Sequence, residues 1–255
     1  MARYQIVLVY DGSRFLGSQR QAAKSRTVQG ELERALMKLG WQGSTILLAG
    51  RTDTGVHASG QVGAFDLEWK HSLAELVAAL NSNLPTDIAV RLAKAVPADF
   101  HPRFEASSRR YHYHIFCQPL RDPLREHYAW RVWPPLDGDA LQRAAYLFLG
   151  RHDFASFGSP PRPGSSTVRT VMRTGWQNQG DQWTFEVQAD AFLYRMVRKL
   201  VHVQVAVGQG RLAIQVVADA LTGQPSKLPG GLAVPNGLTL VEVTYPIATD
   251  VLALS

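Results

Sequence analysis

One carboxylate and one guanidinium lie close together in a glycine-rich segment of the chain. Asp53 stands two residues after Arg51, within residues 50–60, which contain three glycines. The apolar runs at 45–49 and 61–65 predict a strand on each side of this loop. A loop between two core strands is held firmly yet stays exposed, and a carboxylate beside a fixed cation stays ionised. The pattern therefore indicates a site for a carboxylate that acts as an anion.

An aspartate in a glycine-rich turn more often bonds its own backbone than performs chemistry, so Asp53 alone does not identify an enzyme. The segment around it, residues 50–58, resembles the signature of the tRNA pseudouridine synthase A family. Members of that family isomerise uridine in the tRNA anticodon stem-loop. The resemblance extends from about residue 4 to residue 246. The other matching stretches are, in order, 10–13, Gly17 with 19–21, Asn81 with 87–90, 100–104, 109–113, 154–157, Phe192 with 196–198, and 237–238 with Tyr245.

The resemblance implies a reaction at positions 38, 39 and/or 40 of the tRNA and a role for three residues. Asp53 would be the nucleophile that attacks the ribose of the target uridine, or would otherwise assist cleavage of the C1′–N1 bond. The freed uracil would then turn and rejoin through C5. Arg198 would pair with Asp53 and favour its ionised form. Tyr111 would stack on the extruded base and is a candidate for moving protons. The reaction needs no redox step, so neither a cofactor nor a metal is expected.

Four further residues are candidates for contact with the RNA. Arg51 would hold the RNA or order the loop, and His57 would order the loop by hydrogen bonding. Arg109 and Arg110 lie within residues 103–131, where six arginines are interleaved with aromatic residues. Because arginine with aromatics suits a folded RNA surface, phosphate contact is expected for both.

A second basic stretch contains no acidic residue. If residues 192–207 form a helix, four basic side chains fall within one face at 3.6 residues per turn. They are Arg195, Arg198, Lys199 and His202. A solvated face is the ordinary explanation of such a stripe. Since no acid offsets the charge here, a track for phosphates is favoured.

Bulk composition agrees with a polyanionic partner. The 255 residues include 27 Lys and Arg against 21 Asp and Glu, which gives a net charge of +6. The single cysteine, Cys117, excludes an intrachain disulfide and argues against a cysteine-ligated zinc site. The first residues do not resemble a signal peptide, and no run approaches the roughly 18 apolar residues of a membrane span. A cytoplasmic protein is expected.

The element pattern predicts an α+β fold with two ferredoxin- or RRM-like lobes. Their sheets are expected to be mainly antiparallel and to flank a basic cleft. The first lobe, residues 1–105, would carry the Asp53 loop, and the second, residues 106–255, would carry the basic helix. The resemblance also implies a homodimer. Predicted strands are 4–10, 45–49, 61–65, 88–96, 110–116, 168–177, 183–189 and 238–245; predicted helices are 28–39, 72–80, 141–149, 192–207 and 211–221.

Two other functions share some of these features. A non-catalytic RNA-binding module would have the same basic surface and lobes, with Asp53 only structural. An aspartic protease also contains Asp-Thr-Gly, but it needs two such aspartates that share a proton, and Arg51 would prevent that sharing.

The chain departs from the family pattern at a few positions. Ser18 stands where the family usually has tryptophan, Thr54 where alanine is more frequent, Asp190 where asparagine is common, and His202 where a small residue is usual. None of these changes removes a proposed catalytic group.

Overall fold

The strands of this protein form one large sheet. The computed structural model describes residues 1–21 and 25–246. Most strands follow the order β4-β1-β3-β10-β5-β9-β8-β7, while β2 pairs with β3 and β6 pairs with β5. All neighbours are antiparallel except β3 with β10 and β5 with β6. The strands are β1 Ala2–Tyr10, β2 Leu47–Leu48, β3 His57–Leu67, β4 Ile88–Val96, β5 Ser108–Cys117, β6 Trp130–Val132, β7 Gly150–Asp153, β8 Val168–Gln179, β9 Gln182–Ala189 and β10 Leu238–Thr244.

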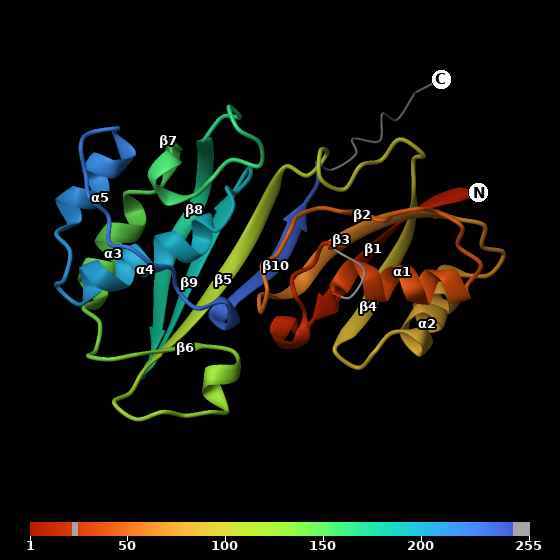
Figure 1. Cartoon of the computed structure of the whole chain (residues 1–255), viewed down its shortest axis with the longest axis horizontal. Coiled ribbons are helices and arrows are strands. Elements are labelled where there is room, and N and C mark those ends of the chain that lie inside the picture. Colours follow the sequence, from red (N-terminus) through yellow and green to blue (C-terminus); the bar gives the residue numbers. More distant parts are fainter. Residues whose placement is uncertain (22–24, 247–255) are drawn as a thin grey trace, which may run out of the picture.

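The α-helices lie in two groups (Figure 1). α1 (Val28–Lys38) and α2 (Leu73–Asn83) accompany β1, β3 and β4. α3 (Gly138–Tyr146), α4 (Met196–Gly208) and α5 (Ile214–Leu221) accompany β8 and β9, and β5 and β10 run between the two groups. The protein is therefore a mixed α+β protein with a large, mostly antiparallel sheet, as the sequence predicts. The sheet is continuous through both halves of the chain.

Local sequence determines where the first two helices begin. The side chain of Thr27 accepts a hydrogen bond from the backbone N–H of Gly30 at the start of α1. Ser72 and Glu75 form a reciprocal capping box at the start of α2. Each helix then buries a leucine stripe, with Leu32 and Leu36 in α1 and Leu76 and Leu80 in α2.

The basic helix begins later than predicted. α4 starts at Met196, whereas the apolar pattern places its start at 192. The residues in between instead form an irregular segment, in which the backbone N–H of Tyr194 donates to the carbonyl of Ser159 at 2.9 Å. Arg195 then has φ 63° and ψ 6°, the left-handed conformation. The apolar residues before it continue the helical spacing, which is why periodicity extends the helix too far.

The two halves of the chain meet at β10. Thr239 and Leu240 of this strand pair in parallel with His57 and Ala58 at the start of β3. On its other side Leu240 pairs with Tyr111 of β5. The register therefore brings the Asp53 loop, which directly precedes β3, beside the strand that carries Tyr111.

Other predicted elements differ only at their ends. The strand expected at 45–49 is limited to β2, and the helix expected at 141–149 is α3, which starts earlier because Asp137 caps it through the N–H of Ala140. Within residues 1–21 and 25–246, no helix has the length and apolar character that crossing a membrane requires.

Candidate active site

The structure brings Asp53 and Arg198 together from opposite halves of the chain. The Nη1 group of Arg198 donates to Oδ2 of Asp53 at 2.8 Å, across 145 residues of sequence. Its Nε donates to the carbonyl of Ala233, also at 2.8 Å. Side-chain exposure is 20% for Asp53 and 14% for Arg198, so the pair is shielded yet still open to a ligand. Two anchoring bonds orient the guanidinium, which is what a fixed counterion for a carboxylate requires.

The Asp53 loop is held from the inside by neutral groups of the first half, an arrangement we call the inner bracket (Tyr10, Ser18 and Gln61). The backbone N–H of Thr52 donates to Oγ of Ser18 at 2.8 Å, and the N–H of Ser18 donates to the carbonyl of Thr52 at 3.1 Å. The hydroxyls of Tyr10 and Thr52 lie 2.9 Å apart. Gln61 Nε2 donates to the carbonyl of Gly50 at 2.9 Å. Ser18, where the family usually has tryptophan, thus supplies a buried hydroxyl to the loop, and the sequence alone carries no signal of that contact.

His57 lies behind the loop and is buried. Its Nδ1 accepts from the N–H of Gly12 at 3.0 Å, and its Nε2 lies 3.1 Å from the carbonyl of Asn236. Burial lowers the pKa of His57, and the charge of Asp11 offsets only part of this effect. The neutral ring therefore predominates at neutral pH. Both ring nitrogens of His57 are thus engaged with backbone groups, those of Gly12 and Asn236. We do not retain it as a residue that contacts RNA.

Tyr111 is almost fully buried beside the ion pair. Its ring meets Phe192 edge to face, with centroids 5.1 Å apart. Burial raises the pKa of Tyr111, and the charges of Tyr10 and Asp53 raise it further while Arg109 opposes them. The phenol therefore stays protonated near neutral pH, so Tyr111 can present an aromatic face or donate a hydrogen bond but is not a phenolate base.

Tyr113, two residues along β5 from Tyr111, occupies the core. It is fully buried, and its hydroxyl donates to the carbonyl of Val234 at 2.7 Å. This bond fixes the segment that also contains Ala233, the second acceptor for Arg198.

The guanidiniums of Arg109 and Arg110 are occupied by other groups. Arg109 is buried, and its Nη1 and Nη2 donate to backbone carbonyls. Arg110 projects from the opposite face of β5 to Tyr111 and pairs with Glu242 at 2.7 Å. We therefore retain neither among the residues proposed to contact phosphate. Sequence composition could not reveal these acceptors, because three of them come from distant segments (Ala49, Asp190 and Glu242) and the nearby ones, Arg103 and Ala106, are backbone carbonyls.

The basic stripe is also divided among different tasks. Arg198 pairs with Asp53, Lys199 donates to the carbonyl of Pro229, and His202 stacks on Trp130 with centroids 6.4 Å apart. Burial lowers the pKa of His202 and of Lys199. Of the four residues of the stripe, only Arg195 is exposed, and it has no acidic partner among the described residues. The predicted phosphate track is thus reduced to this one side chain.

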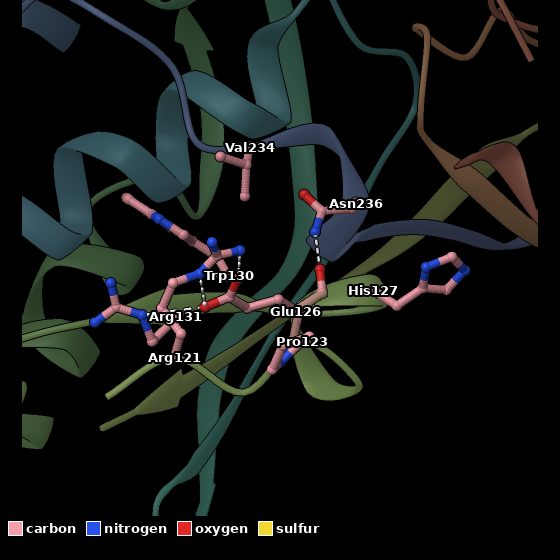
Figure 2. Close-up of a pocket in the computed structure, with 9 residues that line it drawn as sticks. Arg121, Pro123, Glu126, His127, Trp130, Arg131, Val234 and Asn236 are labelled. Carbon is pink, nitrogen blue, oxygen red and sulfur yellow. Dashed lines mark hydrogen bonds and ion pairs between the residues drawn. The ribbon is translucent and has the colours of Figure 1, made fainter. Parts of the chain in front are cut away.

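A cavity of about 500 Å³ opens beside the segment that anchors Arg198 (Figure 2). Its wall includes Val234 and Asn236, and its charged residues are Arg121 and Arg131, which both pair with Glu126. The one carboxylate offsets only one of the two guanidiniums, so these three side chains carry a formal net charge of +1. Among residues 1–21 and 25–246, no cluster of three or more His, Cys, Asp or Glu is placed to hold a metal ion.

Comparison with known proteins identifies the family. A family model described as tRNA pseudouridine synthase matches residues 6–105 and 144–246. The chain is 39% identical over 246 residues to tRNA pseudouridine synthase A of Paraburkholderia phymatum, covering 96% of this chain and 92% of that protein. It is 38% identical over 247 residues to the protein of that name from Pseudomonas aeruginosa, covering 96% and 86%.

Other comparisons agree in part. The protein of the same name from Klebsiella pneumoniae is 39% identical over 241 residues, covering 94% of this chain and 89% of that protein. A solved Cbf5–Nop10–Gar1 complex aligns with a TM-score of 0.33 and 12% identity over 79% of this chain and 45% of that one, which is too distant to support an argument. The family model and the near full-length relatives together show that this chain belongs to the tRNA pseudouridine synthase family.

Proposed function

We propose that this isomerase converts uridine to pseudouridine at positions 38, 39 and/or 40 of the tRNA anticodon stem-loop, with Asp53 as the nucleophile. The observation that carries the proposal is the ion pair of Asp53 with Arg198 beside Tyr111. The C1′–N1 bond breaks and a C1′–C5 bond forms. N1 regains a proton and the C5 proton is lost, so atoms and charge balance without a cofactor.

Each of the three residues has a task that its surroundings support. Arg198 pairs with the Asp53 carboxylate, and its second bond, to the carbonyl of Ala233, fixes the direction of the guanidinium. Tyr111 supplies an aromatic face for the extruded base, which is worth roughly 1–3 kcal/mol in stacking. Its raised pKa makes it a proton donor in hydrogen bonds rather than the base that removes the C5 proton.

Two exposed arginines are proposed to contact tRNA phosphates. Arg51 lies on the exposed side of the Asp53 loop, and Arg195 borders a cavity of about 340 Å³ one helical turn before Arg198. A left-handed backbone costs a non-glycine residue roughly 1–2 kcal/mol. Arg195→Gly is therefore expected to stabilise the fold while weakening tRNA binding, and Arg195→Ala to weaken binding without that gain. Equal tRNA affinity of all three proteins would remove Arg195 from the proposal.

The larger organisation is part of the same proposal. Residues 1–105 and 106–255 would act as two lobes that flank a basic cleft, and the reaction would occur where β3, β10 and β5 adjoin. This location is supported by the contacts of Asp53 with the second half of the chain. The resemblance to the family supports a homodimer, for which light scattering is the test, and action on tRNA supports a cytoplasmic location.

The test is tritium release from an unmodified tRNA transcript labelled at uracil C5. Wild-type protein without added cofactor is expected to release tritium to water, and Asp53→Ala is expected to bind the transcript but release none. Binding without release by the folded wild type would favour the RNA-binding module instead. Normal turnover by Asp53→Ala would remove Asp53 from the mechanism.

A further inference from the structure

The Asp11 carboxylate joins the two halves of the chain next to the Asp53 loop. Its Oδ1 accepts from the N–H and hydroxyl of Ser13 at 2.9 and 2.6 Å. Its Oδ2 accepts from Nε2 of His127 at 3.1 Å and from the hydroxyl of Tyr128 at 3.0 Å, residues 116 and 117 positions further along the chain. We call Asp11, His127 and Tyr128 the outer clamp.

The outer clamp depends on a charged acceptor. Burial by itself raises the pKa of Asp11, but the hydrogen bonds from Ser13, His127 and Tyr128 together lower it below its ordinary value. The carboxylate is therefore ionised throughout the neutral range. Hydrogen bonds to an ionised acceptor are roughly twice as strong as neutral ones.

The outer clamp belongs to a closed ring of contacts. The ring of Tyr128 packs on that of His57, with centroids 5.1 Å apart. His57 in turn binds the N–H of Gly12 and the carbonyl of Asn236. The side chain of Asn236 completes this closed set of contacts by donating to the carbonyl of Glu126, as Figure 2 shows. Four segments that are distant in sequence thus fix one another.

This closed set of contacts is connected to the Asp53 carboxylate in two ways. A Cβ on Gly12 would lie 2.0 Å from the carbonyl oxygen of Val56, so the backbone beside Asp11 packs directly on the Asp53 loop. The segment that ends at Asn236 also supplies the carbonyl of Ala233 that orients Arg198. Displacing the outer clamp would therefore displace both ends of the ion pair with Asp53.

Asp11 is poorly suited to touch the RNA itself. Its negative charge repels phosphates, and both of its oxygens are already occupied by protein donors. A role through other residues fits these contacts better than a role in binding.

We propose that Asp11, together with His127 and Tyr128, is a positioning device for the isomerisation. The outer clamp holds the turn at residues 125–128 against the Asp53 loop, and thereby sets the orientation of Arg198 toward Asp53. This inference rests on the proposed function of Asp53.

The experiment measures single-turnover tritium release at saturating enzyme, and tRNA affinity by filter binding. Asp11→Asn and Asp11→Ala are expected to slow release about 10- to 100-fold, with the Kd for tRNA within about 3-fold of wild type. Tyr128→Phe, which removes one hydroxyl, should slow release about 3-fold. The matched control is Asp66→Asn, because the Asp66 carboxylate likewise accepts from a side chain distant in sequence, Arg3 at 2.7 Å, but at the far end of the β1–β3 pair. It should leave the rate unchanged.

Two further variants separate positioning from general stability. His127→Gln keeps an N–H donor near Asp11 and should retain most of the rate that His127→Ala loses. The double variant Asp11→Asn with Tyr128→Phe should lose less than the product of the single losses, because both changes break one contact.

Three results would overturn the proposal. One is a folded Asp11→Asn protein with a release rate within 2-fold of wild type, roughly the scatter of such measurements. Another is a Kd that rises as kcat/KM falls while the rate at saturation stays constant, which would make Asp11 a binding residue. Both leave the proposed function intact as long as wild type releases tritium. A wild-type protein that releases none would remove the proposed function together with the reaction that the outer clamp serves.

Discussion

The two sides of the Asp53 loop are held by different chemistry. The inner bracket consists of neutral groups from the first half that are almost inaccessible, with Ser18 at 0% exposure. The outer clamp is charged, comes from both halves and is partly open, with 29% of the Asp11 side chain exposed. Buried neutral bonds belong to the folding of the loop itself. The outer contacts determine how that loop meets Arg198 and Tyr111, so we expect the inner side to govern stability and the outer side to govern rate.

The largest effect on the reaction rate is expected at Arg198, whose orientation the outer contacts are proposed to set. Arg198→Ala should slow single-turnover tritium release about 100- to 1,000-fold, because a preorganised charge beside the reacting carboxylate is lost. Arg198→Lys should recover little of this loss, since an ammonium cannot bridge Asp53 and Ala233 as the planar guanidinium does. A loss of less than 10-fold in Arg198→Ala would mean that the ion pair is mainly structural.

The inner bracket should appear in stability instead. Ser18→Ala leaves the buried N–H of Thr52 without its acceptor, so we expect the free energy of unfolding in urea to fall by about 1–3 kcal/mol. Release rates of the folded variant should change little. Ser82→Ala is the control, because the Ser82 hydroxyl bonds a carbonyl on the exposed side of α2. A slow but fully stable Ser18→Ala protein would reverse the division between the two sides.

Acidification should weaken the contacts of His57 before it weakens the inner bracket, which contains no group that titrates near neutral pH. Burial keeps the pKa of His57 below its ordinary 6.5, so the unfolded chain binds a proton that the folded protein resists. The contribution of neutral His57 is complete above pH 6.5 and is lost as the pH falls from there through the folded pKa. His114 and His202 shift in the same direction for the same reason and add to the slope.

Amide hydrogen exchange can distinguish a weakening of the His57 contacts from a weakening of the inner bracket. Between pH 7 and pH 5, protection of the Gly12 N–H, which donates to His57, should decrease relative to that of the Thr52 N–H, which donates to Ser18. His57→Gln should flatten the pH dependence of stability without abolishing it. Equal loss of protection at both amides would show that the loop opens as one unit.

The smallest effect is expected at a loop residue held by neither side. Arg51 is exposed and makes no ion pair among the described residues. Arg51→Ala should raise the Kd for tRNA about 3-fold and reduce the salt slope of binding by about one. Its melting temperature and rate at saturation should equal those of wild type. A rate loss without a binding loss would place Arg51 in the chemistry.

The fold was largely predictable because most of its elements have clear local signals. The strands predicted at 88–96, 168–177 and 183–189 correspond to β4, β8 and β9 within two residues at each end, and Ser72 with Glu75 caps the start of α2. The start of α4 was missed because its upstream residues keep helical spacing although Arg195 adopts a left-handed backbone. Sheet continuity through β10 also lies beyond local patterns, since it depends on pairing between distant strands.

The candidate site was predictable only in part. The resemblance to the family brought Asp53, Arg198 and Tyr111 together, which spacing over 145 residues could not do. Charge patterns do not show which basic groups are already occupied, so they cannot separate Arg109, whose guanidinium bonds backbone carbonyls, from an exposed arginine such as Arg51. Asp11 lies in a stretch that matches the family, residues 10–13. Its partners His127 and Tyr128 are more than 100 residues away, so no local pattern predicts these contacts.

The most direct measurement is position-resolved pseudouridine formation by Asp53→Asn. Asparagine keeps the size of the side chain and an oxygen that can accept from Arg198, but it lacks the anionic nucleophile. We predict that wild type forms pseudouridine within positions 38–40 of an unmodified tRNA, and that Asp53→Asn binds the same tRNA with wild-type affinity and forms none. Pseudouridine formed by Asp53→Asn at a rate near that of wild type would contradict the account.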